Sequence, residues 1–193
     1  MNLTAAGQVF LAESRKALDA VSASVRRAQR AGRPDPRLSL AMKPNGDAGL
    51  LEPILQRYRR DPDAIEIEVI VSGIGEQAPM LRDGRADVAF LTAPYDDLAG
   101  FDTEPLLNRD QVAVLPRAHR LADRAALTLA DLAGEQLPRW PGDDVQATTV
   151  VVAWPERTTS RAVAALIRAS VEAADGSCSG VAAVHPTVIS RSR

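Results

Sequence analysis

Strand and helix patterns alternate in the first half of this chain, and no other feature constrains the fold as much. Short apolar runs at residues 38–42, 65–71 and 87–91 have the length and patterning of β-strands. Between them, residues 47–60 and 75–83 repeat apolar side chains at the spacing of amphipathic helices. This order favours a mostly parallel sheet with right-handed crossovers, so we predict an α/β fold.

The second half of the chain is less regular, and we expect it to complete the same domain. The sequence predicts strands at residues 101–107, 111–115 and 148–154, and a helix at residues 161–174. A short helical turn is expected around residues 129–133. Residues 175–193 are rich in Ser and Gly, and we expect them to form a flexible tail.

A long helix is expected at the N-terminus, over residues 4–30, with Thr4 as its N-cap. It carries two rows of residues spaced by seven, as in a coiled coil. The rows are Leu11, Leu18 and Val25, and Ser14, Val21 and Ala28. The helix either packs on its own domain or dimerises, in which case Leu11, Leu18, Val21 and Val25 form the seam. A Gly- and Pro-containing break at residues 31–36 separates it from the globular domain.

Bulk composition is that of an ordinary globular protein and excludes several classes. Of the 193 residues, 46% are hydrophobic, and the net charge of −2 does not suggest a protein that coats nucleic acid. We see no secretory signal and no apolar run long enough to span a membrane, so we expect a cytoplasmic protein. The single cysteine, Cys178, lies among loop-forming residues, and we interpret it as an inert surface thiol.

Catalytic and metal-binding patterns are weak. The two histidines, His119 and His185, are far apart, and no His, Cys or carboxylate cluster has metal-ligand spacing. The sequence Gly73-Ile74-Gly75 does not extend to a dinucleotide-binding fingerprint. We therefore assign no catalytic residue, metal ligand or cofactor.

A small-molecule site is better supported, at the carboxyl ends of the first three strands. In open parallel sheets, ligands bind beyond those ends. The candidate residues are Lys43, Asn45, Ser72, Gly73 and Thr92. Two of the loops precede helices, whose free N–H groups suit an anion, and Lys43 adds a positive charge. The alternative is a set of ordinary turns with Lys43 in solvent.

The order of several motifs over residues 3–142 resembles the LysR-type transcription regulators. Residues 3–18 resemble the family's junction between the winged helix-turn-helix and the linker helix. Residues 50–62 resemble the first helix of its sensing domain. Residues 81–89 (LRDGRADVA) resemble the run L-x-x-G-x-x-D-V-A. The remaining matches are residues 112–122 (V-L-P-x-x-H-x-L-A), 127–132, and 150–169, the closing strand and helix.

This resemblance implies a periplasmic-binding-protein-like (type II) sensing domain of two lobes, with an effector in the cleft between them. It also implies dimerisation through the linker helix and promoter binding by a winged helix-turn-helix. We expect a linker helix at residues 1–33 and the sensing domain at 38–174, with the crossing between lobes near residues 138–140. The recognition helix is absent from this sequence, and the second lobe is expected to be truncated.

The main hypothesis is the effector-sensing part of a regulator, with a small, anionic molecule, a second copy and, indirectly, promoter DNA as partners. Two alternatives stay open. One is a dimerising fragment that antagonises an intact regulator, and the other is a solute-binding protein of the same fold. An enzyme is the least favoured class.

Overall fold

The strand–helix alternation builds one sheet in the computed structural model, which describes residues 3–109, 113–128, 130–135 and 148–178. Strands β1 (Arg37–Met42), β2 (Glu66–Val71) and β3 (Val88–Ala93) pair in parallel, with β1 in the middle. The order of the five strands is β2-β1-β3-β5-β4. The predicted parallel arrangement of the first three strands is therefore confirmed.

Two further strands make the sheet mixed. β5 (Thr148–Pro155) lies between β3 and β4 (Phe101–Arg109) and is antiparallel to both. Four of the five strands consequently point the same way, and only β5 is reversed. The carboxyl ends of β1, β2, β3 and β4 thus share one edge, which also receives the start of β5.

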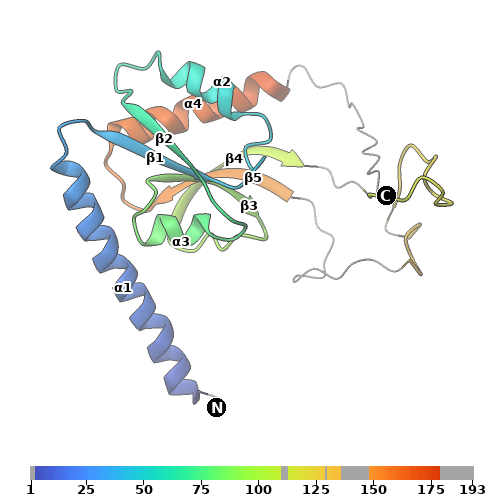
Figure 1. The fold of residues 1–193 in the computed structure, drawn as a ribbon, viewed down its shortest axis with the longest axis horizontal. Coiled ribbons are helices and arrows are strands. Elements are labelled where there is room, and N and C mark those ends of the chain that lie inside the picture. Colours follow the sequence, from blue (N-terminus) through green and yellow to red (C-terminus); the bar gives the residue numbers. More distant parts are fainter. Residues whose placement is uncertain (1–2, 110–112, 129, 136–147, 179–193) are drawn as a thin grey trace.

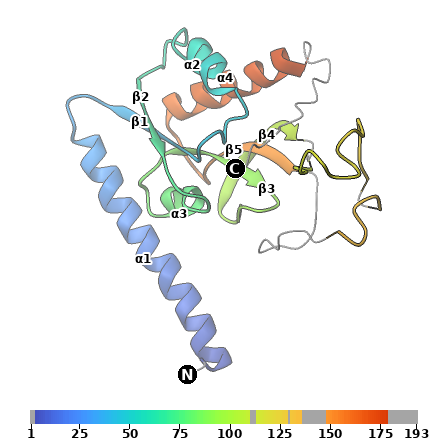
Figure 2. The same cartoon turned by 45° about the vertical axis from the view of Figure 1, so that its right-hand side comes forward.

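Helices cover both faces of the sheet, as Figures 1 and 2 show. α2 (Leu51–Tyr58) and α4 (Arg161–Cys178) lie on one face, and the short α3 (Gln77–Arg82) lies on the other. Alternate residues of the central strands face the two layers, as the twofold repeat of a strand requires. Leu40, Phe90 and Val152 pack under α2 and α4, whereas Ala41 and Leu91 pack against α3.

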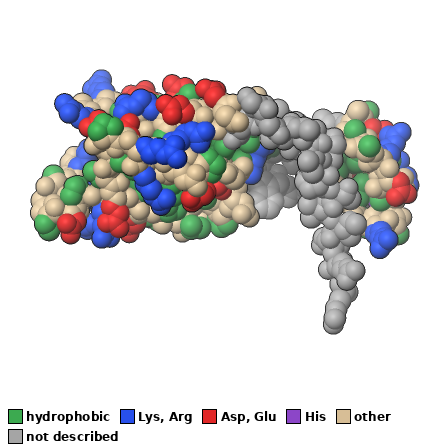
Figure 3. Space-filling model, turned by 90° about the horizontal axis from the view of Figure 1, so that it is seen from above, with side chains coloured by type: hydrophobic (Ala, Val, Ile, Leu, Met, Phe, Trp, Pro, Cys, Tyr) green, Lys and Arg blue, Asp and Glu red, His purple; other side chains and the backbone are tan. Residues whose placement is uncertain are grey.

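Basic and acidic side chains are interspersed on the face that α2 and α4 cover (Figure 3). One ion pair joins α4 to the turn that follows α2. In it, the guanidinium of Arg168 donates to Asp61 Oδ2 at 2.8 Å. This hydrogen bond is the main cause that lowers the pKa of Asp61 below its ordinary value.

α2 is shorter than the helix predicted over residues 47–60. Ala48 and Gly49 have positive φ angles of 55° and 83°, so no helix can pass through them. Asp47 instead caps the helix from outside, its Oδ2 accepting from the N–H of Leu51 at 3.1 Å. At the other end, buried Tyr58 accepts a hydrogen bond from the N–H of Ile65 at 2.9 Å.

α4 is longer than predicted and continues from Ala174 to Cys178. The expectation that Cys178 lies in a loop was therefore wrong. Ala173 and Ala174 are buried, and Gly176 lies close to the Arg57 side chain. Packing of this kind outweighs the low helix propensity of the Gly and Ser residues near the end.

The prediction of a strand at residues 111–115 was wrong for residues 113–115, which are the ones that the structure describes. Residues 113–115 are not in a strand, and Val114 is 61% exposed. An apolar run forms a strand only where a neighbour pairs with its backbone, and no described strand does so here. Nearby, residues 130–135 form hydrogen-bonded turns, while Leu129 and the predicted crossing at residues 138–140 lie outside the described residues.

The predicted N-terminal helix is confirmed as α1 (Ala5–Ala31), with Thr4 as its N-cap. Thr4 Oγ1 accepts from the N–H of Gly7 at 3.1 Å, and the helix ends at Gly32. Its 27 residues span about 40 Å. Figures 1 and 2 both show α1 projecting away from the sheet, which it approaches only near its C-terminal end.

Candidate functional site

Two of the predicted binding residues touch each other at the carboxyl edge of the sheet. Lys43, directly after β1, donates from Nζ to Thr92 Oγ1 of β3 at 2.8 Å. Ser72 follows β2 and continues the ladder, since its N–H donates to Met42 O at 3.0 Å. The structure therefore brings Lys43, Ser72 and Thr92 to one edge, because β1 and β2 end in register and β3, which is parallel to β1, ends on the same side.

Asn45 lies at the same edge, next to a cation that the sequence analysis missed. The guanidinium of Arg109 donates to the backbone oxygen of Asn45 at 3.2 Å. Arg109 ends β4, which runs parallel to β1 although its hydrogen-bonded neighbour is β5. Beside it, Thr149 Oγ1 of β5 donates to Asn108 Oδ1 at 2.8 Å. If the strand predicted at residues 101–107 had been extended by two residues, the sequence analysis would have placed Arg109 at this edge.

The chain's own carboxylates already accept from several backbone N–H groups of the loops at this edge. Gly73 N–H donates to Glu76 Oε2 at 2.8 Å, and Asp47 caps α2. Thr92 N–H likewise donates to Asp96 Oδ2 at 2.7 Å. The positive charge at this edge therefore comes mainly from the side chains of Lys43 and Arg109.

Gln77, the first residue of α3, is a second residue that sequence reasoning missed. Its Nε2 donates to Ser72 Oγ and to Gly73 O, both at 2.7 Å. The side chain is fully buried, and its Oε1 has no hydrogen-bond partner among the described residues. The Gln77 amide therefore fixes both the loop after β2 and the hydroxyl group of Ser72.

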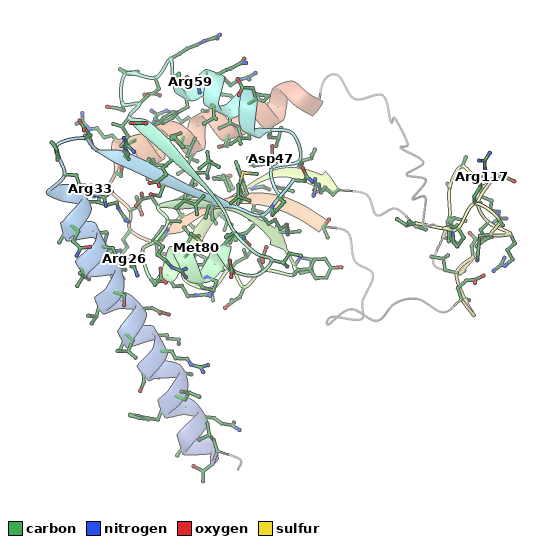
Figure 4. All side chains as sticks on the ribbon, in the orientation of Figure 1. Arg26, Arg33, Asp47, Arg59, Met80 and Arg117 are labelled. Carbon is green, nitrogen blue, oxygen red and sulfur yellow. The ribbon has the colours of Figure 1, made fainter. Side chains whose placement is uncertain are left out.

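The predicted dimerisation residues of α1 are all exposed in the single chain. Leu18, Val21 and Val25 are between 51% and 66% exposed, and Leu11 is 39% exposed. Side chains project freely along most of the helix in Figure 4, with Arg26 and Arg33 labelled near its C-terminal end. Of the two alternatives for α1, the first therefore holds for one part of the helix: α1 packs on its own domain only near its C-terminal end.

One tight contact joins α1 to the sheet. Ala23 is 2% exposed and lies against Gly84, where a Cβ atom would come within 2.7 Å of Ala23 Cα. Arg30 donates to Gly84 O at 2.6 Å and to Asp87 Oδ1 at 2.7 Å. Asp87 also accepts from Ser39 N–H at 3.0 Å, so one carboxylate links α1, β1 and the start of β3.

Catalytic and metal-binding features are sparse in the described part of the chain. His119 Nε2 lies 3.2 Å from Glu135 Oε2, a contact that, with Arg120, lowers the pKa of Glu135. Among the described residues, no group of three His, Cys, Asp or Glu side chains could hold a metal ion. No described helix combines the length and the apolarity that crossing a membrane requires. His185 lies outside the described residues.

Comparison with known proteins supplies the remaining observations. Residues 31–141 match the family described as "LysR substrate binding domain". The "Hca operon transcriptional activator HcaR" of Escherichia coli is 33% identical over 138 residues, covering 68% of this chain and 44% of that protein. The "HTH-type transcriptional regulator AlsR" of Bacillus subtilis is 28% identical over 156 residues, covering 80% and 48%. The chain thus spans about half the length of the curated relatives it matches.

A solved structure has the same fold. It is the C-terminal domain of a probable LysR family transcriptional regulator from Rhodococcus sp. RHA1, with a TM-score of 0.54 and 19% identity. The match covers 68% of this chain and 97% of that domain. At this level of identity the likeness concerns the fold alone, and the chemistry rests on the residues described above.

Proposed function

Because the chain belongs to the LysR substrate-binding domain family, we propose that it is the effector-sensing part of a LysR-type transcription regulator. Its ligand is a small organic anion, bound at the carboxyl edge of the sheet. Binding controls promoter recognition by a winged helix-turn-helix that is not among these 193 residues. A regulator of this kind acts in the bacterial cytoplasm, where the DNA is.

The contact between Lys43 Nζ and Thr92 Oγ1 is the observation that carries this proposal. Thr92 is only 6% exposed and orients the ammonium group at the strand ends, while Arg109 adds a second cation beside Asn45. Charge-assisted hydrogen bonds of this type are the strong contacts to a carboxylate. Ser72 offers a hydroxyl donor, since its oxygen already accepts from Gln77.

A thermal-shift titration with aromatic and aliphatic carboxylates tests the site. A ligand that binds only the folded chain raises its melting temperature, so at least one carboxylate should stabilise the wild type. Lys43→Gln should abolish most of the shift while leaving the unliganded melting temperature nearly unchanged. Lys16→Gln is the matched control, because Lys16 is the other lysine and is 72% exposed on α1.

Two outcomes would count against the proposed site. In the first, no carboxylate stabilises the wild type. In the second, Lys43→Gln and Lys16→Gln respond alike, which would mean that general electrostatics rather than the strand-end site attracts the ligand.

We also propose that α1 dimerises through Leu11, Leu18, Val21 and Val25. Their exposure supports this, because a stripe of large apolar side chains in water is stabilised by burial against a partner helix. Alanine and serine elsewhere in the seam make the association weak, so we expect a monomer–dimer equilibrium.

Sedimentation equilibrium of the full chain tests this assembly. The double variant Leu18→Glu with Val25→Glu should shift the chain to monomer. The control, Ala12→Glu with Ala20→Glu, adds the same charge to the same helix away from the seam and should sediment like the wild type. A wild type that is monomeric at high concentration, or equal behaviour of both variants, contradicts the assignment.

The comparisons also support binding over catalysis. The relatives reported above are named as transcriptional regulators, and the described residues hold no metal-ligand cluster. We accordingly propose no reaction for this chain.

A further inference from the structure

A cavity lies at the other end of the sheet, away from the strand ends that form the proposed effector site. Its volume is about 520 Å³, and it lies between the last turns of α1, the start of β1 and the loop that joins β5 to α4. Pockets for small organic molecules have volumes of roughly 300–1,000 Å³. The cavity is therefore large enough for such a molecule.

Positive charge predominates in the wall of this cavity. Four guanidinium groups line it, against two carboxylates. The arginines are Arg27, Arg30, Arg37 and Arg157, and the acids are Asp87 and Glu156. Arg30 is already paired with Asp87 at 2.7 Å, and Arg37 with Glu66 at 3.2 Å.

The other two arginines, Arg27 and Arg157, are unpaired within the part of the chain that the structure describes. Neither makes an ion pair or a side-chain hydrogen bond with any residue in the described ranges. They come from different elements, Arg27 from α1 and Arg157 from the loop before α4, so their convergence on one cavity depends on the tertiary fold. Each has its full donor capacity available for an oxyanion.

The start of α4 adds to the positive potential. Thr159 and Ser160 line the cavity just before the helix, whose first turn contains no acidic residue. Ser160 Oγ accepts from the N–H of Val163, which leaves the earlier N–H groups of the helix without an intrahelical acceptor. The positive end of an 18-residue helix therefore faces the same space as the two unpaired arginines.

Part of the cavity wall is apolar. Ile65 and Pro155 line this part with half-buried side chains, whereas Leu38, Leu81 and Val163 are each no more than 3% exposed and offer almost no accessible surface. An inorganic ion would leave this apolar surface in contact with water. An anion with an apolar body would cover it and gain the corresponding hydrophobic free energy.

We propose that this cavity is a second ligand site, for a small organic oxyanion with an acidic head group and an apolar body. The head group binds Arg27, Arg157 and the start of α4, and the body lies on Ile65 and Pro155. A ligand held in this way contacts both α1 and the sheet. This site is distinct from the proposed effector site and does not depend on it.

Isothermal titration calorimetry of the full chain at constant ionic strength tests the proposal, with three probes. Phenyl phosphate combines an oxyanion with an apolar ring, inorganic phosphate has only the oxyanion, and phenol has only the ring. Phenyl phosphate should bind with a submillimolar dissociation constant, at least about tenfold tighter than either of the other two. In a Lys43→Gln background, which removes the charge of the proposed effector site, this binding should still depend on Arg27 and Arg157, and that dependence separates the two sites.

Paired variants locate the site. Arg27→Gln with Arg157→Asn should weaken phenyl phosphate binding by at least about tenfold, since two charge-assisted contacts are lost. Asn is chosen at position 157 because Arg157 has a φ of 64°, which Asn tolerates. The control, Arg26→Gln with Arg59→Asn, removes the same charge from residues that do not line the cavity and should bind like the wild type.

Three results would overturn the proposal. The first is the absence of phenyl phosphate binding at about 10 mM, and the second is equal binding of inorganic phosphate. The third is equal weakening by the two double variants, which would mean that net charge alone attracts the probe. Circular dichroism of each variant verifies that the chain is folded, as we expect for exposed arginines.

Discussion

Substitution of Gly84 by alanine tests how firmly α1 is attached to the sensing domain. Gly84 has a φ of 76°, and an alanine in this left-handed conformation costs about 1–2 kcal/mol. Its Cβ would lie 2.7 Å from Ala23 Cα and 3.1 Å from Ala23 Cβ. Relieving this overlap requires a shift of α1, which costs about a further 1–3 kcal/mol.

Gly100→Ala provides the matched control. Gly100 has a similar φ of 84°, but a Cβ placed there would meet nothing within 4 Å. Gly100→Ala therefore incurs the backbone cost without the steric one. The difference between the two variants, about 1–3 kcal/mol, isolates the contact between α1 and the domain.

Urea denaturation followed by circular dichroism measures this difference. With a denaturant slope of about 1–3 kcal/mol per M, Gly84→Ala should unfold about 1 M earlier than Gly100→Ala. If the two variants unfold at the same urea concentration, α1 does not pack on Gly84 in solution. The cavity beside Arg27 and Arg30 would then lack one of its walls.

Three further substitutions test the packing of the domain. Tyr58→Phe leaves the N–H of Ile65 without its acceptor and should cost about 1–3 kcal/mol in urea denaturation; an unchanged midpoint would contradict the hydrogen bond. Leu166→Ala removes a fully buried side chain and should cost about 2–5 kcal/mol by the same measurement. Because the pKa of Asp61 is lowered by Arg168, its stabilisation is present above the ordinary value of 3.8 and is lost as pH falls through the lowered pKa. Asp61→Asn should thus melt below the wild type at neutral pH, and the two melting curves should converge in acid.

Local patterns in the sequence determined the first three strands, α1 and one edge of the sheet. Periodicity alone predicted the first three strands, the helices between them and α1, because side chains in a strand or helix repeat at a fixed spacing. Parallel strands end at a common edge, so Lys43, Ser72 and Thr92 could be assigned to that edge from their positions after each strand.

Only the tertiary structure decided which distant residues meet. β5 inserts between β3 and β4, and this places Arg109 at the predicted edge. The contact of Ala23 with Gly84 and the convergence of Arg27 with Arg157 join segments far apart in the chain. Such contacts depend on how elements pack in three dimensions, and the spacing of residues along one element carries no information about its neighbours.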